Sequence, residues 1–243
     1  MKLRLSLLTL LLFATATAQH TISGTMSPPD EYKWIIVYRL KPGSQNYIVD
    51  GQVSEGKFSV TIPAEAKPGV YRLVYAVPQE EFNFDVIYSG EEDIELQFNT
   101  ETGAQFTASK ENILYNSYVQ EIQAMEQEIS TFFYPEVAKE TIWNDGFTKM
   151  KTIQQNYEQK TKGMLAQTFI KANTPYIPKK REDIIDFIAN KKAQYLAPID
   201  YSDATLQSST FLTDKTLGYI FTAISVDAVT AAQQEQEVVA NIS

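Results

Sequence analysis

The chain contains no cysteine and a single histidine, His20. Without a thiol it can form no disulfide bond and offers no thiolate for nucleophilic attack or disulfide exchange. Apart from His20, the chain has no histidine that could serve in a Ser-His-Asp triad or a histidine-rich zinc site. His20 also lies close to the amino terminus, where chains fray, so we expect it to be exposed and not catalytic. The sequence therefore predicts no catalytic residues and no metal ligands.

Motifs for nucleotides and calcium are missing as well. The chain has no Walker loop, no Gly-x-Gly-x-x-Gly run and no twelve-residue calcium loop, so we expect no cofactor and no cofactor-binding residues. Its net charge at pH 7 is −9. A negatively charged chain does not attract the phosphates of nucleic acid or of anionic lipid. Nucleic-acid binding is therefore excluded from the expected functions.

The first 18 residues have the pattern of a secretion signal. Two basic residues, Lys2 and Arg4, precede an apolar run at 5–13, and small residues follow up to Ala18. This order predicts a cleavable signal peptide with cleavage before Gln19. The apolar run is too short to span a bilayer and no second long run follows, so we expect no membrane span. The mature chain loses two of 21 basic residues and none of 30 acidic ones, which gives a net charge of −11. We expect it to be soluble in the periplasm or outside the cell.

Residues 19–108 are predicted to form a β-sandwich. This part holds seven of the ten glycines and six of the ten prolines, and these breakers separate short runs rich in β-branched and aromatic residues. Residues 54–56 are typical of a hairpin turn. Seven or eight short strands at this spacing favour an antiparallel sandwich. The strands are expected at 34–40, 46–53, 57–62, 70–77, 82–88 and 94–98.

Residues 109–243 change to a helical period, which makes the whole chain α+β. Ser109 is a plausible N-cap of a helix with one apolar stripe: Leu114, Tyr118, Ile122, Met125, Ile129 and Phe132. Further helices are expected at 143–172 and 181–195, and Asp203, Thr213 and Thr230 are possible caps of later ones. We interpret the stripes as packing core. Polar residues and Gly103 predict an exposed connection at 99–110.

Two kinds of residue are candidates for a site. Tyr32, Trp34 and Tyr38 could form a face that binds peptide or sugar, although aromatic residues along a strand often serve packing. The acidic clusters are Glu91–Asp93, Asp183 with Asp186, and Asp200 with Asp203. Each has a simple structural explanation as a solvated loop or a helix start. A carboxylate-dependent hydrolase would need two acids facing each other across a cleft and stays the third choice.

Several short strings resemble a known family. The residues at 20–24, 49–60, 70–73 and 93–96 are similar to a β-rich domain of unknown function. That domain follows the signal peptide in Gram-negative secreted thioredoxin-like thiol-disulfide oxidoreductases. Residues 112–118 resemble the first helix after this domain, and 187–212 resemble the helical linker. The likeness covers most of residues 20–215.

The resemblance implies an accessory role rather than catalysis. The family's functional residues are a Cys-x-x-Cys pair in a thioredoxin-like domain beyond the linker, and this cysteine-free chain carries none of them. The chain is expected to be either the front part of a longer redox protein or a relative without the catalytic domain. The leading hypothesis is a non-catalytic interaction module of a thioredoxin-like system, with a peptide- or carbohydrate-binding module as the alternative. We also expect self-association through the last apolar stripe, which comprises Leu217, Ile220, Phe221, Ile224, Val226, Val229, Val238, Val239 and Ile242.

Overall fold

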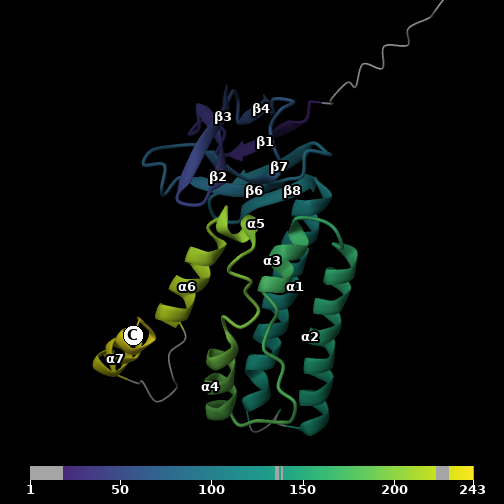
Figure 1. Cartoon of the computed structure of the whole chain (residues 1–243), viewed down its shortest axis with the longest axis vertical. Coiled ribbons are helices and arrows are strands. Elements are labelled where there is room, and N and C mark those ends of the chain that lie inside the picture. Colours follow the sequence, from purple (N-terminus) through teal and green to yellow (C-terminus); the bar gives the residue numbers. More distant parts are fainter. Residues whose placement is uncertain (1–18, 135–136, 138, 223–229, 243) are drawn as a thin grey trace, which may run out of the picture.

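The computed structural model describes residues 19–134, 137, 139–222 and 230–242. Eight strands come first and the helices follow (Figure 1). The strands are β1 Thr21–Ser27, β2 Trp34–Lys41, β3 Ser44–Gln52, β4 Lys57–Thr61, β5 Gly69–Val74, β6 Asn83–Tyr88, β7 Ile94–Asn99 and β8 Gly103–Ala108. The helices are α1 Lys110–Ser130, α2 Glu140–Lys160, α3 Ala166–Ala172, α4 Ile184–Gln194, α5 Ala204–Gln207, α6 Phe211–Thr222 and α7 Ala231–Ile242, with a short 3-10 helix at Thr131–Phe133. The expected α+β class, strands before helices, is confirmed. The proposed signal peptide lies outside the described residues.

The strands form two four-stranded sheets that stack as a sandwich. One sheet has the order β4-β1-β7-β8 and the other has the order β3-β2-β5-β6. All pairs between these strands are antiparallel except β1 with β7, which run parallel from Ile22 beside Ile94 to Ser27 beside Asn99. The sandwich is therefore mostly antiparallel, as expected, with one parallel pair. The chain crosses between the sheets before β7 and enters β7 from the same end as β1.

The predicted turn at 54–56 exists, but it does not join a hairpin. Ser54 and Lys57 exchange both backbone hydrogen bonds at 2.9 Å, and Glu55 and Gly56 both have positive φ. This is the geometry of a two-residue hairpin turn. However, β3 and β4 belong to different sheets. Gly56 lies against the other sheet, where its carbonyl accepts a 2.6 Å hydrogen bond from the N–H of Met26, and the turn thus redirects the chain across the sandwich.

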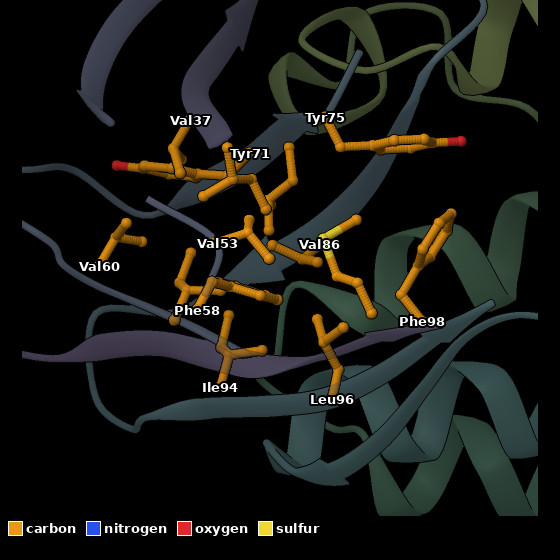
Figure 2. Packing of buried hydrophobic residues seen from close by; sticks show 14 of the residues in the cluster. Val37, Val53, Phe58, Val60, Tyr71, Tyr75, Val86, Ile94, Leu96 and Phe98 are labelled. Atoms are coloured by element: carbon orange, nitrogen blue, oxygen red, sulfur yellow. The ribbon is translucent and has the colours of Figure 1, made fainter. Parts of the chain in front are cut away.

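The sandwich core lies between the two sheets (Figure 2). Val37, Tyr71 and Val86 come from one sheet and meet Ile94 and Leu96 from the other. All five are at most 1% exposed, so the apolar faces of both sheets are removed from water together. Burial of such side chains contributes roughly 1.5–3 kcal/mol each and is the main force that holds the sheets together.

The first helix begins and packs as its sequence predicts. The hydroxyl of Ser109 accepts a 3.4 Å hydrogen bond from the N–H of Asn112, which confirms the N-cap. The stripe from Tyr118 to Phe132 is buried against α2 and α4. The single helix expected at 143–172 is wrong, because α2 ends at Lys160 and α3 begins at Ala166. Gly163, with a φ of +82°, lies in the break.

The later helices begin at two of the three expected caps. Asp203 accepts hydrogen bonds from the N–H groups of Thr205 and Leu206, and Thr230 accepts one from Gln233 at the start of α7. Thr213 caps nothing and lies inside α6. The hydroxyl of Ser209 instead accepts a 3.2 Å hydrogen bond from the N–H of Phe211, where α6 begins. The expectation for Thr213 is therefore wrong, since the hydroxyl at the helix start belongs to a residue four positions earlier.

The sandwich and the helices share an interface. Asn112 of α1 donates to the carbonyl of Ile87 and accepts from its N–H, both at 2.8 Å, so its amide pairs with the open edge of β6. Leu40, Val70 and Ile87 of the β3-β2-β5-β6 sheet form one buried cluster with side chains of α3, α5 and α6, including Phe169, Leu206 and Phe211. The two parts are packed into one body (Figure 1).

The exposed connection expected at 99–110 is wrong. Residues Gly103–Ala108 form β8, which pairs with β7, and Ser109 is buried. Gly103 and the polar residues mark the turn before β8 and the outer face of an edge strand, which local composition alone does not separate from a loop. Within the described residues, no helix is long and apolar enough to cross a membrane.

Candidate functional site

The structure divides the predicted aromatic face. Tyr32 is 6% exposed and packs edge-on against Tyr75 and Phe98 in the sandwich core, with ring centroids 5.3 and 6.4 Å away. Trp34 and Tyr38 lie half-buried on β2. The inclusion of Tyr32 in a surface face is therefore wrong. Tyr32 precedes the start of β2 at Trp34, so the alternation of the strand does not govern its direction.

A different tyrosine joins Tyr38 on this face. Tyr47 of β3 is the register partner of Tyr38, and the two rings meet edge-on at 6.3 Å. Tyr47 is 58% exposed, and its hydroxyl donates to Asp50. The sequence pattern missed this residue because the pairing of β2 with β3 cannot be read from either strand alone. Trp34, Tyr38 and Tyr47 thus supply the aromatic side chains of β2 and β3 that a planar ligand could contact.

The acidic loop at Glu91–Asp93 has a structural role. Asp93 accepts a 2.7 Å hydrogen bond from the N–H of Thr21, which is the main cause that lowers its pKa. Nδ1 of His20 lies 3.6 Å from the same carboxylate, and the His20 side chain is only 15% exposed. The expectation of a solvent-exposed histidine is therefore wrong. Glu92 accepts from the Ser109 hydroxyl at 2.9 Å and so fastens the start of α1.

Glu111 is the most deeply buried acid and was not a sequence candidate. It is 4% exposed, and its two carboxylate oxygens accept hydrogen bonds from the N–H groups of Leu165 and Ala166 at 3.0 and 2.7 Å. Burial is the main cause that raises its pKa, and the neighbouring Glu92 and Glu91 raise it further. A cavity of about 310 Å³ adjoins it. Since both oxygens already cap the start of α3, Glu111 is better explained as a structural group than as a general acid.

The other acidic pairs also serve local structure. Asp183 accepts from the N–H of Asp186 at 2.9 Å and caps α4, while Asp200 accepts from the Ser202 hydroxyl and N–H. In the described part of the chain, no group of three or more side chains is placed to hold a metal ion. These positions give no support to paired-carboxylate chemistry.

A polar cavity of the helical region lies between α1, α4, α6 and the segment at 173–176. It measures about 360 Å³. Tyr118 lies at its base, with the hydroxyl 2.7 Å from Gln154 Oε1 and 2.9 Å from the carbonyl oxygen of Asn173. Burial raises the pKa of Tyr118, so this hydroxyl remains a neutral donor. The lining includes Gln123, Glu126, Tyr176, Lys191, Gln194, Tyr195 and Lys215.

Lys215 brings a cation into this cavity. Its Nζ lies 4.8 Å from the ring centroid of Tyr195 and 5.8 Å from that of Phe211, within the range of a cation–π interaction. Burial is the main cause that lowers its pKa, the charge of Lys191 lowers it further, and Glu126 acts in the opposite direction. The sequence carried a signal for this residue. Lys215 stands four positions after the buried Phe211, on the inward face of α6, where a lysine is unusual.

An apolar cavity adjoins the polar one. It measures about 230 Å³ and is lined by side chains such as Phe133, Phe147 and Phe187. Glu126, Tyr176 and Lys191 line both cavities, and the Lys191–Glu126 ion pair, with Nζ 2.7 Å from Oε1, stands between them. From the sequence, the apolar stripes of the helices are expected to serve only as packing core. The stripe positions are indeed packed, but α4 and the segment at 173–176 leave a groove beside α1.

No protein-family model and no curated protein matches this chain. The fold and the groove define its class as a β-sandwich joined to a helical region that bears a mixed polar and apolar groove. The functional assignment therefore rests on these surfaces and on the residues that line them.

Proposed function

We propose that this chain is a secreted, non-catalytic interaction module of a thioredoxin-like thiol-disulfide exchange system. In this proposal the signal peptide is removed between Ala18 and Gln19, and the mature chain works in the periplasm or outside the cell. Its partner is a thioredoxin-like domain that supplies the cysteines this chain lacks. The order of a β-sandwich followed by helices, which the resemblance implied, supports this reading.

The observation that carries the proposal is the surface of α6 and α7. Leu217 and Phe221 on α6, and Val239 and Ile242 on α7, are between 46% and 64% exposed. The two helices are held together, since the Asn241 amide donates to the carbonyl of Ile220 at 3.1 Å. Figure 1 shows α7 far from both sheets, at the outer end of the helical region. Exposed large apolar side chains gathered on one helix pair are typical of a protein-binding surface.

This exposed surface includes only some of the residues of the predicted apolar stripe. Ile224, Val226 and Val229 lie outside the described residues, while Ile220 and Val238 are half-buried. We name Leu217, Phe221, Val239 and Ile242 the α6–α7 surface. A thioredoxin-like domain is its proposed occupant, and a second copy of the chain is the other occupant that the following experiment distinguishes.

Titration calorimetry with a purified thioredoxin-like domain tests the proposal. We expect saturable one-to-one binding that Phe221→Glu weakens at least about tenfold, because a charge placed in an apolar interface must be desolvated. Ile185→Glu is the matched control, since Ile185 is similarly exposed but lies on α4. No binding, or equal loss in both variants, would contradict the proposal. Sedimentation of the chain alone shows whether Phe221→Glu instead disrupts a dimer.

A second candidate function is favoured by the aromatic face of β2 and β3. Trp34, Tyr38 and Tyr47 offer stacking surface for a peptide or a sugar. In a Trp143→Phe variant, Trp34 is the only tryptophan, and saturable quenching of its emission by an oligosaccharide or peptide would favour this reading over partner binding.

A further inference from the structure

Lys215 lies in the helical groove and, among the described residues, forms no close ion pair. Among the described residues, no carboxylate lies within 4 Å of its Nζ, whereas Lys191 and Lys192 are paired with Glu126 and Glu237. Its stabilising contacts are the faces of Tyr195 and Phe211. Removal of an ammonium group from water is unfavourable unless a counter-charge offsets it. Among the described residues that line the polar cavity there are two lysines and one glutamate, so positive charges outnumber negative ones by one.

The groove places apolar space next to this cation. The adjoining cavity of about 230 Å³ is lined by Ile129, Phe147, Ile184, Phe187 and Ile188, among others. It is larger than an engineered apolar cavity of about 150 Å³ that binds benzene. Lys191 and Tyr176 line both cavities, so a molecule that occupies both must pass them. The groove therefore has a positively charged part next to an apolar part, and the two parts share lining residues.

The position of Lys215 is fixed by its surroundings. Gly218, one turn further along α6, lies so close to Tyr195 that an added Cβ would come within 2.7 Å of the Tyr195 hydroxyl oxygen. The Tyr195 ring also packs against Tyr219 at 6.1 Å. The segment after α4 and the helix α6 thus meet closely at this point. Tyr195 thus supports the ammonium group, and both Tyr195 and Lys215 line the polar cavity.

We propose that the groove between α1, α4 and α6 binds an apolar carboxylate, with the carboxylate at Lys215 and the tail in the cavity lined by Phe147 and Phe187. The proposal is independent of the α6–α7 surface and of any thioredoxin-like partner. The same chemistry is found at the carboxyl terminus of a peptide that ends in apolar residues and in a fatty acid. A carboxylate bound at Lys215 would supply the missing counter-charge, and the tail would leave water.

Trp143 provides a direct readout of binding. Its ring contacts Phe133, Phe147 and Phe187, at 4.8–5.9 Å between centroids, and all three line the apolar cavity. A Trp34→Phe variant leaves Trp143 as the only tryptophan. We expect octanoate to change the Trp143 emission saturably, and 1-octanol to bind at least about tenfold more weakly. A second pair of probes is acetyl-Leu-Leu with a free carboxylate and the same dipeptide as its amide. The tighter of the two acids identifies the source as lipid-like or peptide-like.

Matched variants locate the site. Lys215→Met is expected to weaken octanoate binding at least about tenfold, and Lys215→Arg to retain it within about threefold. Lys149→Met is the control, because Lys149 pairs with Glu128 on the surface and lines neither cavity. Ile184→Glu, in the apolar lining, should also weaken binding, whereas the neighbouring Ile185→Glu should not. Absence of saturable binding by both acids would overturn the proposal. Equal binding of acid and alcohol, or unchanged binding by Lys215→Met and Ile184→Glu, would overturn it as well.

Discussion

Between pH 8 and pH 11, loss of the protons of Tyr71 and Tyr115 is expected to lower the free energy of unfolding by about 3 kcal/mol, because these buried tyrosines keep their protons in the folded chain. Burial raises the pKa of Tyr71 and of Tyr115 to about 12, and it also raises that of Tyr118. The unfolded chain releases these protons near pH 10. Stability is therefore fully present below pH 10 and is lost as the pH rises towards 12. Tyr71 and Tyr115 each account for about 1.4 kcal/mol of this loss at pH 11.

Urea unfolding at pH 8 and pH 11, followed by circular dichroism, measures the loss. In Tyr71→Phe the difference between the two pH values should shrink by about 1.4 kcal/mol, since phenylalanine has no proton to lose. Tyr201→Phe is the control, because Tyr201 is 52% exposed. Lys215 acts in the opposite direction: its lowered pKa makes stability rise with pH, but only up to the ordinary lysine value near 10.5. Equal stability at both pH values would contradict the burial of these hydroxyls.

Glu111→Ala is expected to lower the free energy of unfolding by about 3 kcal/mol. The substitution leaves the N–H groups of Leu165 and Ala166 without their acceptors at a buried helix start. A buried donor without a partner costs about 1–3 kcal/mol. The helix α3 that begins there has no other side-chain cap and carries Phe169 and Ile170 into two different apolar clusters. Loss of this cap therefore weakens the helical core and the interface with the sandwich together.

Two variants make the Glu111 prediction specific. Glu111→Gln keeps the size of the side chain and one acceptor oxygen, and it should cost only about 1 kcal/mol. Glu128→Ala removes an acid from the exposed end of the same helix, where the ion pair with Lys149 is worth less than about 1 kcal/mol. Thermal or urea unfolding should show the largest loss of stability in Glu111→Ala, a smaller loss in Glu111→Gln and the smallest loss in Glu128→Ala. A loss in Glu111→Ala no greater than in Glu128→Ala would show that Glu111 does not hold α3.

Several elements whose signals are local were predicted correctly. Alternation at Lys57–Thr61, the N-cap at Ser109 and the stripe on α1 depend on neighbouring residues, and the structure confirms them. Sheet pairing depends on distant residues, so the hairpin at 54–56 was wrong and the parallel pairing of β1 with β7 was not expected. The break before α3 was also missed, because its cap, Glu111, lies more than 50 residues earlier in the chain.

The candidate site was harder to predict than the fold. Trp34 and Tyr38 were chosen for their type and spacing, but their neighbour Tyr47 is defined by strand register. The groove requires Glu126, Lys191 and Lys215 from three helices to meet, and periodicity assigns each helix only an inward face. A lysine on the inward face of α6 was the one local sign of this cavity.

Every proposed surface depends on the sandwich and the helices being one folded unit, and the two tryptophans test this directly. Trp34 lies in β2 and Trp143 in α2, so the variants Trp143→Phe and Trp34→Phe report on the two parts separately. In urea we expect both emissions to change at the same midpoint. We also expect Asn112→Ala, which breaks the pairing with Ile87, to lower both midpoints equally. Two separate midpoints, with Asn112→Ala shifting only one of them, would show that the two parts fold independently and would contradict this structure of the interface.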